Sequence, residues 1–144
     1  MELSDSAIKA FLRQFERNNN AGELEALVAQ FTEVFLVAGN QEVKAVPAKA
    51  FALALPKRKQ LFAELGCQSS KLISIAKTPL DSHHALVQTQ WQMNFINPEN
   101  RPEEVVVASK FVLTSTPDGI KILCYSPDQD IMAVLKDRGI LPPT

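Results

Sequence analysis

One segment of this sequence, residues 83–95 (HHALVQTQWQMNF), alternates between apolar and polar side chains over almost its whole length. One set consists of Ala85, Val87, Thr89, Trp91, Met93 and Phe95, and the other of His84, Gln88, Gln90, Gln92 and Asn94, with Leu86 as the exception. A period of two predicts a long β-strand with one buried face. The only tryptophan, Trp91, lies in the middle of the apolar set. We therefore expect a curved sheet around this strand, with helices packed on its apolar face.

Three helices are predicted between residues 4 and 65. The first, Ser4–Arg17, carries a stripe of apolar residues at helical spacing, and the asparagines at 18–20 are predicted to end it. Its stripe consists of Ile8, Phe11, Leu12 and Phe15. A second helix is predicted at about residues 21–30. A third, at residues 48–65, contains Pro56, which removes a hydrogen-bond donor and is predicted to kink the helix or divide it in two.

The rest of the chain is mostly strand-like. Besides the segment around Trp91, strands are predicted at residues 31–39, 41–46, 67–77, 104–115 and 120–125. Ser126, Pro127 and Gln129 have the spacing of a helix start, which predicts a short final helix up to Gly139. Helices followed by a run of strands predict an α+β fold. We expect one domain, residues 1–144, with a curved antiparallel sheet that forms a cone under the N-terminal helices.

Composition narrows the function classes. Hydrophobic residues make up 46% of the chain and charged residues 22%, and the net charge is −1. This balance predicts a soluble globular protein that binds neither nucleic acid nor membrane. The start of the chain lacks the pattern of a signal peptide, and Cys67 and Cys124 fit no metal or redox spacing. We expect two reduced thiols in a cytoplasmic protein, with no metal and no cofactor.

The order of elements resembles the nuclear transport factor 2-like superfamily, which includes SnoaL-like polyketide cyclases and ketosteroid isomerases. The segments that carry the resemblance are residues 7–31 (AIKAFLRQFERNNNAGELEALVAQF), 31–39 (FTEVFLVAG) and 47–55 (PAKAFALAL), together with the alternating strands from Leu72 to Tyr125. The resemblance implies a conical fold with an internal pocket, homodimers that form through the sheet, and diverse functions.

Catalytic residues of the isomerases are not matched in this chain. Their general-base aspartate would lie at the end of the first strand, where this sequence has Phe35-Leu36-Val37-Ala38-Gly39, and their tyrosine on the first helix has no counterpart. His83 and His84 are the remaining acid–base candidates, but neighbouring residues in an extended segment point to opposite faces. Whether the chain is an enzyme stays open, and the missing aspartate favours a non-catalytic domain.

Two surfaces are candidates for binding. The cone implied by the resemblance would be lined by Phe11, Phe15, Phe35, Trp91, Met93 and Phe111. Packing of an ordinary core explains the same residues. The polar row His84, Gln88, Gln90, Gln92 and Asn94 has almost no charge, and Val106, Ala108 and Val112 of the neighbouring strand are expected on the same side. Such a face is a candidate homodimer surface, or otherwise a plain solvent face.

Three hypotheses therefore stay open. The first is a non-catalytic domain that dimerises through the sheet and holds a small apolar ligand in its cone. The second is a SnoaL-like isomerase, dehydratase or cyclase that acts on a hydrophobic substrate through His83 or His84. The third is a structural association module with a filled core. A cavity that faces a buried ionisable group would favour the enzyme, whereas a filled space behind Trp91 would favour the association module.

Overall fold

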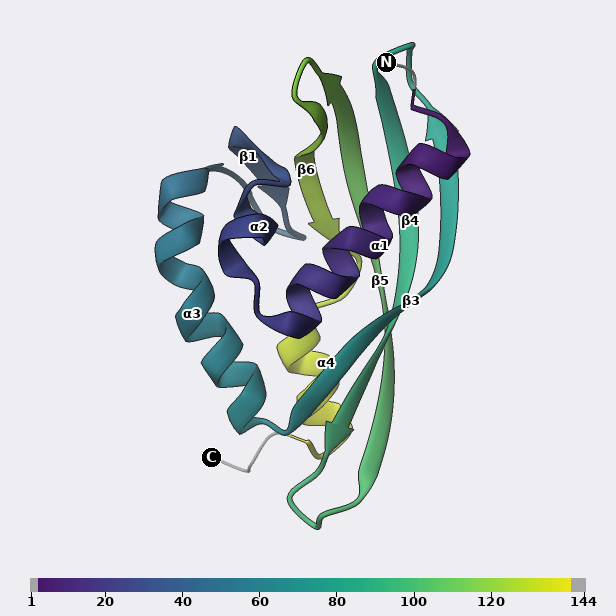
Figure 1. The fold of residues 1–144 in the computed structure, drawn as a ribbon. Helices are drawn as coiled ribbons and strands as arrows, with labels where there is room; N and C mark the ends of the chain where they lie inside the picture. Colours follow the sequence, from purple (N-terminus) through teal and green to yellow (C-terminus); the bar gives the residue numbers. More distant parts are fainter. Residues whose placement is uncertain (1–2, 141–144) are drawn as a thin grey trace.

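A computed structural model describes residues 3–140, so both ends of the predicted 1–144 domain lie outside the described residues. The elements in chain order are α1 (Asp5–Ala21), α2 (Leu24–Val28), β1 (Phe31–Ala38), β2 (Val43–Pro47), α3 (Ala48–Glu64), β3 (Cys67–Pro79), β4 (His84–Ile96), β5 (Pro102–Thr116), β6 (Gly119–Pro127) and α4 (Ile131–Asp137). This order confirms the α+β prediction, with helices before the long strands and a short helix at the end (Figure 1).

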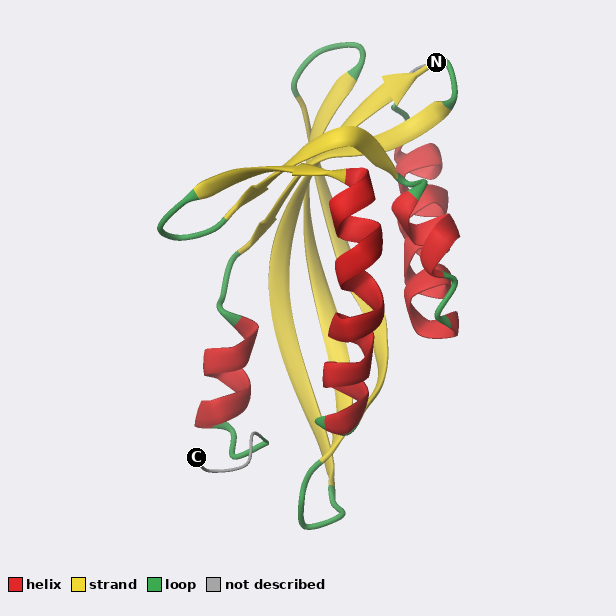
Figure 2. Cartoon of the chain, turned by 90° about the vertical axis from the view of Figure 1, so that its left-hand side faces the viewer, coloured by secondary structure: helices red, strands yellow, loops and turns green. Residues whose placement is uncertain are grey.

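The strands form one curved sheet in the order β2-β1-β6-β5-β4-β3. Four of the pairings among the described strands are antiparallel, but β1 and β6 run parallel. The prediction of an antiparallel sheet therefore misses one pairing. β1 and β6 are far apart in the sequence and no hairpin joins them, so local sequence does not fix their relative direction. In Figure 2, α3 lies in front of the long strands and α1 lies to their right.

Strand β4 has the two faces that its alternation predicts. Ala85, Val87, Thr89, Trp91 and Phe95 are buried, and Gln88 and Gln90 between them are exposed. The strand can be buried on one side because helices α1 and α3 supply apolar side chains to the same core.

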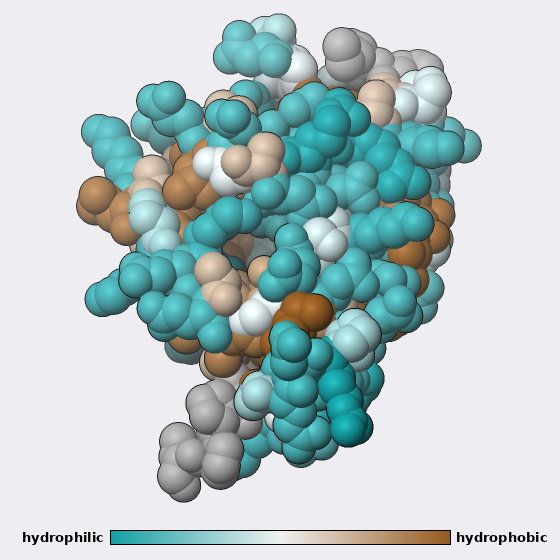
Figure 3. Space-filling model, turned by 60° about the horizontal axis from the view of Figure 1, so that its bottom comes forward, coloured by the Kyte–Doolittle hydropathy of each residue, from teal (hydrophilic) through white to brown (hydrophobic). Residues whose placement is uncertain are grey.

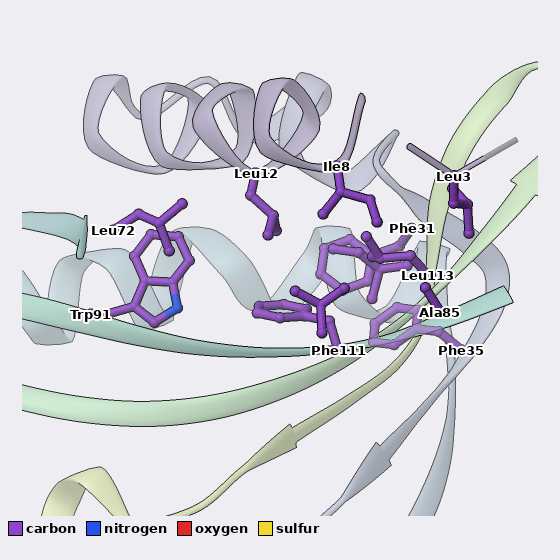
Figure 4. Close-up of a cluster of buried hydrophobic side chains, with 12 residues drawn as sticks. Leu3, Ile8, Leu12, Phe31, Phe35, Leu72, Ala85, Trp91, Phe111 and Leu113 are labelled. Carbon is purple, nitrogen blue, oxygen red and sulfur yellow. The ribbon is translucent and has the colours of Figure 1, made fainter. Parts of the chain in front are cut away.

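Two clusters of buried side chains make up the core. The upper cluster lies under α1, where Ile8 and Leu12 point toward aromatic rings from the sheet (Figure 4). The lower cluster contains Leu135 and Ile140 from the end of the chain, together with Phe95 and Val105 from the sheet. Val107 packs against both clusters and joins them.

Helix α1 continues through the three asparagines that were predicted to end it. Asn18 is buried in the helix, where its amide group accepts a hydrogen bond from Gln14 (2.8 Å) and donates one to Gln30 (3.1 Å). These partners satisfy a side chain that would otherwise compete for backbone groups. The helix ends at Gly22, which has the left-handed conformation (φ 71°) that favours glycine.

Helix α1 also covers the free edge of β3 with polar side chains. The Asn20 amide accepts a hydrogen bond from Ser70 N (2.9 Å) and donates one to Ser70 O (2.8 Å), as a neighbouring strand would. Further along, Leu72 N donates to Glu16 Oε2 (2.6 Å) and Leu72 O accepts from Arg13 Nη1 (3.1 Å). This edge is therefore closed to pairing with another chain at both positions.

Two further local predictions are wrong: the division of the third helix at Pro56 and the start of the final helix at Ser126. Helix α3 is a single helix with Pro56 inside it. Pro56 has no N–H group to donate to the carbonyl of Ala52, but both residues are exposed, so water can bond to that carbonyl instead. The final helix does not start at Ser126, because β6 continues to Pro127 and Asp130 caps α4, accepting a hydrogen bond from Met132 N (3.0 Å). Gln129 instead accepts a hydrogen bond from Ala108 N in β5 (2.9 Å).

Candidate functional site

The upper core is filled by aromatic rings in mutual contact. The ring of Phe15 lies 5.8 Å from that of Trp91 and 5.6 Å from that of Phe111, measured between centroids. Phe31 lies 4.5 Å from Phe35 in the same way. These are the separations at which aromatic side chains pack directly. The rings therefore take up the space between α1 and the sheet around Trp91.

The predicted pocket residues do not form one group. Phe11, Phe15, Phe35, Trp91 and Phe111 belong to the upper cluster, whereas Met93 packs in the lower one. Sequence reasoning missed Phe31, Phe51 and Tyr125, which belong to the same upper cluster but lie on other elements. Whether this group lines a ligand pocket stays a prediction.

Trp91 is held by hydrogen bonds as well as by ring contacts. Its Nε1 donates to Thr89 Oγ1 (2.9 Å), and that hydroxyl in turn donates to Ser109 O (3.0 Å). Thr89 and Ser109 are both buried, so the polar atoms on this inner face find partners within the protein. Trp91 is thus fixed in one position within the core.

The two best-formed hollows among the described residues lie away from this aromatic group. One, of about 150 Å³, is lined by residues that include Leu3, Lys77 and His84. The other, of about 440 Å³, lies between the β4–β5 loop and Arg138. Neither is lined by a predicted pocket residue.

The two histidines lie at the start of β4. His83 is exposed in the preceding turn, and its backbone N–H donates to Asp81 Oδ1 (2.8 Å). His84 Nδ1 lies 2.9 Å from Asp81 Oδ1. The hydrogen bond from His83 N, followed by that from the His84 ring, lowers the pKa of the Asp81 carboxyl. The structure places His84 beside the small hollow near Leu3 and away from the aromatic group.

Tyr125 is an ionisable residue that packs in the upper cluster itself. Its ring lies 5.3 Å from that of Phe111. Burial raises the pKa of the Tyr125 hydroxyl, partly offset by the positive charge of Arg58. The phenol is therefore neutral near pH 7 and is a poor general base.

The two cysteines lie on opposite sides of the sheet. Cys67 packs in the lower core cluster, whereas Cys124 lies opposite Val112 on the outer side. Burial raises the pKa of both thiols, so neither has the activated thiolate of a nucleophile. Within residues 3–140, no three His, Cys, Asp or Glu side chains are grouped closely enough to hold a metal ion.

The outer face of the sheet combines the polar row of β4 with apolar residues of β5. The register places Val106 opposite Gln92, Ala108 opposite Gln90 and Val112 opposite Leu86. Residues directly opposite each other share a face, so the prediction that these side chains lie together is confirmed. Lys110, opposite Gln88, forms an ion pair with Asp128, so its charge is balanced on the same face.

A row of apolar side chains crosses this face and could not be found from one strand alone. The pairings align Leu36 of β1 with Cys124 of β6, Cys124 with Val112 of β5, and Val112 with Leu86 of β4. We call these four residues the apolar row. Leu36 is exposed, as is Val34 on the same strand, and the large side chains of Val106 on β5 and Ile73 on β3 are exposed further along the sheet. The outer face is therefore partly apolar and open to water.

Comparison with known proteins identifies the fold. The sequence matches no protein-family model and shows no significant similarity to a curated protein. Among solved structures, it is similar to an NTF2-like protein with a cystatin-like fold from Novosphingobium aromaticivorans, with 17% identity and a TM-score of 0.70 over 96% of this chain and 88% of that chain. The chain therefore has the NTF2-like fold.

Two other similar structures differ in what they are described to be. A protein from Xanthomonas campestris, proposed to be a calcium/calmodulin dependent protein kinase II association domain, has a TM-score of 0.62 and 10% identity, with 83% of each chain covered. A protein from Catenulispora acidiphila in complex with S-DNPA has a TM-score of 0.67 and 10% identity, covering 89% of this chain and 96% of that chain. At such identities the similarity defines the fold alone.

None of the helices in residues 3–140 is both long and apolar enough to cross a membrane.

Proposed function

We propose that this chain is a non-catalytic association module of the NTF2-like fold that pairs with a second copy of itself through the outer face of the sheet. The observation that supports the proposal most is the apolar row, which crosses four strands of the outer face, while the amide side chains of Gln88, Gln90 and Gln92 lie further along β4 on the same face. Interface cores are depleted of charge, and a two-fold dimer uses the same patch on both copies.

The contents of the cone support a non-catalytic role. The aromatic rings contact one another around Trp91, and both histidines lie outside this group. No carboxylate occupies the end of β1, from Phe35 to Gly39. Proton abstraction from a hydrophobic substrate would need a base inside an apolar pocket. Cys67 and Cys124 are free thiols, which supports a cytoplasmic location as part of the same proposal.

Two charge substitutions at exposed apolar positions test the dimer. Val106 (48% exposed) lies on the outer face, and Leu53 (84% exposed) lies on α3, away from it. We expect wild type and Leu53→Lys to be dimers by light scattering after gel filtration, and Val106→Lys to be a monomer. Because a two-fold interface buries Val106 twice, we expect the dimer dissociation constant to rise at least about a hundredfold.

The two variants, Val106→Lys and Leu53→Lys, also provide the control for folding and the results that would contradict the dimer. Circular dichroism should show that both variants keep the wild-type secondary structure. A wild type that is monomeric at all concentrations would contradict the proposal. Dissociation by Leu53→Lys with no effect of Val106→Lys would assign the interface to α3 instead.

A second candidate function is the binding of a small apolar ligand in the cone by Phe11, Phe15, Phe35, Trp91, Met93 and Phe111. The Catenulispora acidiphila protein in complex with S-DNPA supports it, because that chain has the same fold. The ring contacts around Trp91 argue against it for the upper cluster. Fluorescence of Trp91, the only tryptophan in the sequence, separates the two candidates.

A further inference from the structure

Helix α4 lies where the sheet is incomplete. β6 pairs with β5 only along Ser109–Thr116, so residues 102–108 of β5 pair with β4 on one side and with no described strand on the other. The chain leaves β6 at Pro127 and continues as α4 beside this part of the sheet, where its apolar side chains pack against the inner-face residues Phe95 and Val105. In Figure 2, α4 lies well apart from α1.

Polar groups around α4 bond to the uncovered backbone of β5. Asp128 N donates to Ala108 O (3.0 Å), and Ala108 N donates to the Gln129 side chain (2.9 Å). At the other end of the helix, the Arg138 guanidinium donates to Glu104 O (3.0 Å). The helix therefore takes the place of the missing part of β6.

Two apolar side chains from this segment close the lower core. Leu135 and Ile140 are fully buried. The compartment that they fill is lined by Phe62, Leu65, Cys67, Met93, Phe95 and Val105. From below, the described surface is mostly hydrophilic, with hydrophobic side chains only in places (Figure 3). Docked α4 thus screens an apolar compartment from water.

Side-chain packing rather than backbone pairing holds α4 in place: besides Leu135 and Ile140, the side chains of Ile131, Met132 and Val134 pack against the lower core. The helix has 7 residues, which is too short to be stable in isolation. Among the described residues, one ion pair at the end of this helix joins Arg138 Nη2 to Glu103 Oε2 (3.2 Å), and both side chains are partly exposed. Exposed ion pairs contribute little to stability. The core strands β4 and β5, by contrast, pair along 13 residues.

We propose that α4 is a detachable plug, which leaves the sheet as a unit and opens the lower compartment to a small apolar ligand. The compartment is on the inner side of the sheet, so this proposal does not depend on the dimer. Undocking removes Leu135 and Ile140, and the vacated space then suits a ligand with an apolar part of similar bulk. The upper aromatic cluster stays closed in this opening.

Amide hydrogen exchange of the full-length protein, read by mass spectrometry, tests the plug. We expect the α4 amides to exchange faster than those of β4 and β5, because they open without global unfolding. Arg138→Ala should raise exchange in α4 by about 1.5- to 5-fold, the effect of losing an exposed ion pair. Lys136→Ala is the matched control, because Lys136 is exposed on the same helix and has no side-chain hydrogen bond or ion pair within residues 3–140.

The ligand part of the proposal is tested with the apolar probe 8-anilinonaphthalene-1-sulfonate. A probe that binds only the open form should raise α4 exchange about tenfold at ten times its dissociation constant. Thiol labelling gives a second readout, because Cys67 lines the compartment and Cys124 lies on the other side of the sheet. We expect Arg138→Ala to speed labelling of Cys67 and to leave that of Cys124 unchanged.

Two results would overturn the proposal. If α4 exchanges at the same rate as β4 and β5 in the wild type, the helix is a permanent part of the core. If the probe leaves α4 exchange unchanged, the compartment does not open to an apolar ligand of this size.

Discussion

Trp91 shows how single residues decide between the candidate functions. It is buried, its ring contacts Phe15, and its indole N–H donates to Thr89. Its burial follows from its place in the alternating set, so the sequence alone predicted it. Its neighbours could not be predicted in this way, because Phe15 comes from α1 and is brought close only by folding. The difference between a lined pocket and a filled core lies in those neighbours.

Fluorescence of Trp91 reports on this point without interference, because the chain has no other tryptophan. We expect emission typical of a buried indole, with no saturable change when a panel of small apolar molecules is titrated at neutral pH. The packed rings leave no place for a ligand beside the indole. Saturable quenching or a spectral shift would contradict the filled core and would favour the ligand-binding candidate.

At the scale of elements, α1 both covers the core and protects an edge. Its apolar stripe packs on the sheet, while Arg13, Glu16 and Asn20 bond to the backbone of β3. Edge strands are templates for pairing with other chains, and a helix that satisfies their backbone groups removes this hazard. Asn20 has this role because α1 continues past residue 17.

Substitution of Asn20 tests the edge protection. Asn20→Ala removes both hydrogen bonds to Ser70, so we expect a loss of about 1–2 kcal/mol in the free energy of unfolding and faster amide exchange at Ser70. Asn19→Ala is the matched control. Lys59 Nζ and Gly22 N donate hydrogen bonds to the backbone carbonyl of Asn19, which the substitution keeps. Urea unfolding measures the first quantity. Equal effects of the two substitutions would contradict a specific role of Asn20.

The same elements show what the sequence can predict. Alternation in β4 and β5 predicts correctly which side chains share each face, because the period of a strand is a local property. The predicted end of α1 and the predicted division of α3 at Pro56 were wrong, because the buried partners of Asn18 and the exposure of Pro56 are tertiary facts. The apolar row was missed for the same reason, since it depends on the parallel register of β1 and β6.

At the scale of the whole molecule, the two sides of the sheet have different proposed roles. The inner side holds two filled clusters, and we propose that the lower one opens when α4 leaves. The outer side carries the apolar row and the amide side chains, and we propose that it pairs with a second copy. The fold defines both sides, but NTF2-like folds serve many functions. The side chains on each side of the sheet therefore decide what this chain does.

Methyl NMR of the wild-type protein, with an inert paramagnetic agent in the solvent, measures directly whether a second copy covers the outer face of the sheet. The agent broadens the signals of accessible methyl groups. We predict that Val106, Ile73 and Leu36, although exposed in the single chain, are shielded from it, whereas Leu53 on α3 is strongly broadened. If Val106 and Ile73 are broadened as strongly as Leu53, the outer face is not covered by a second copy and the proposed function is wrong.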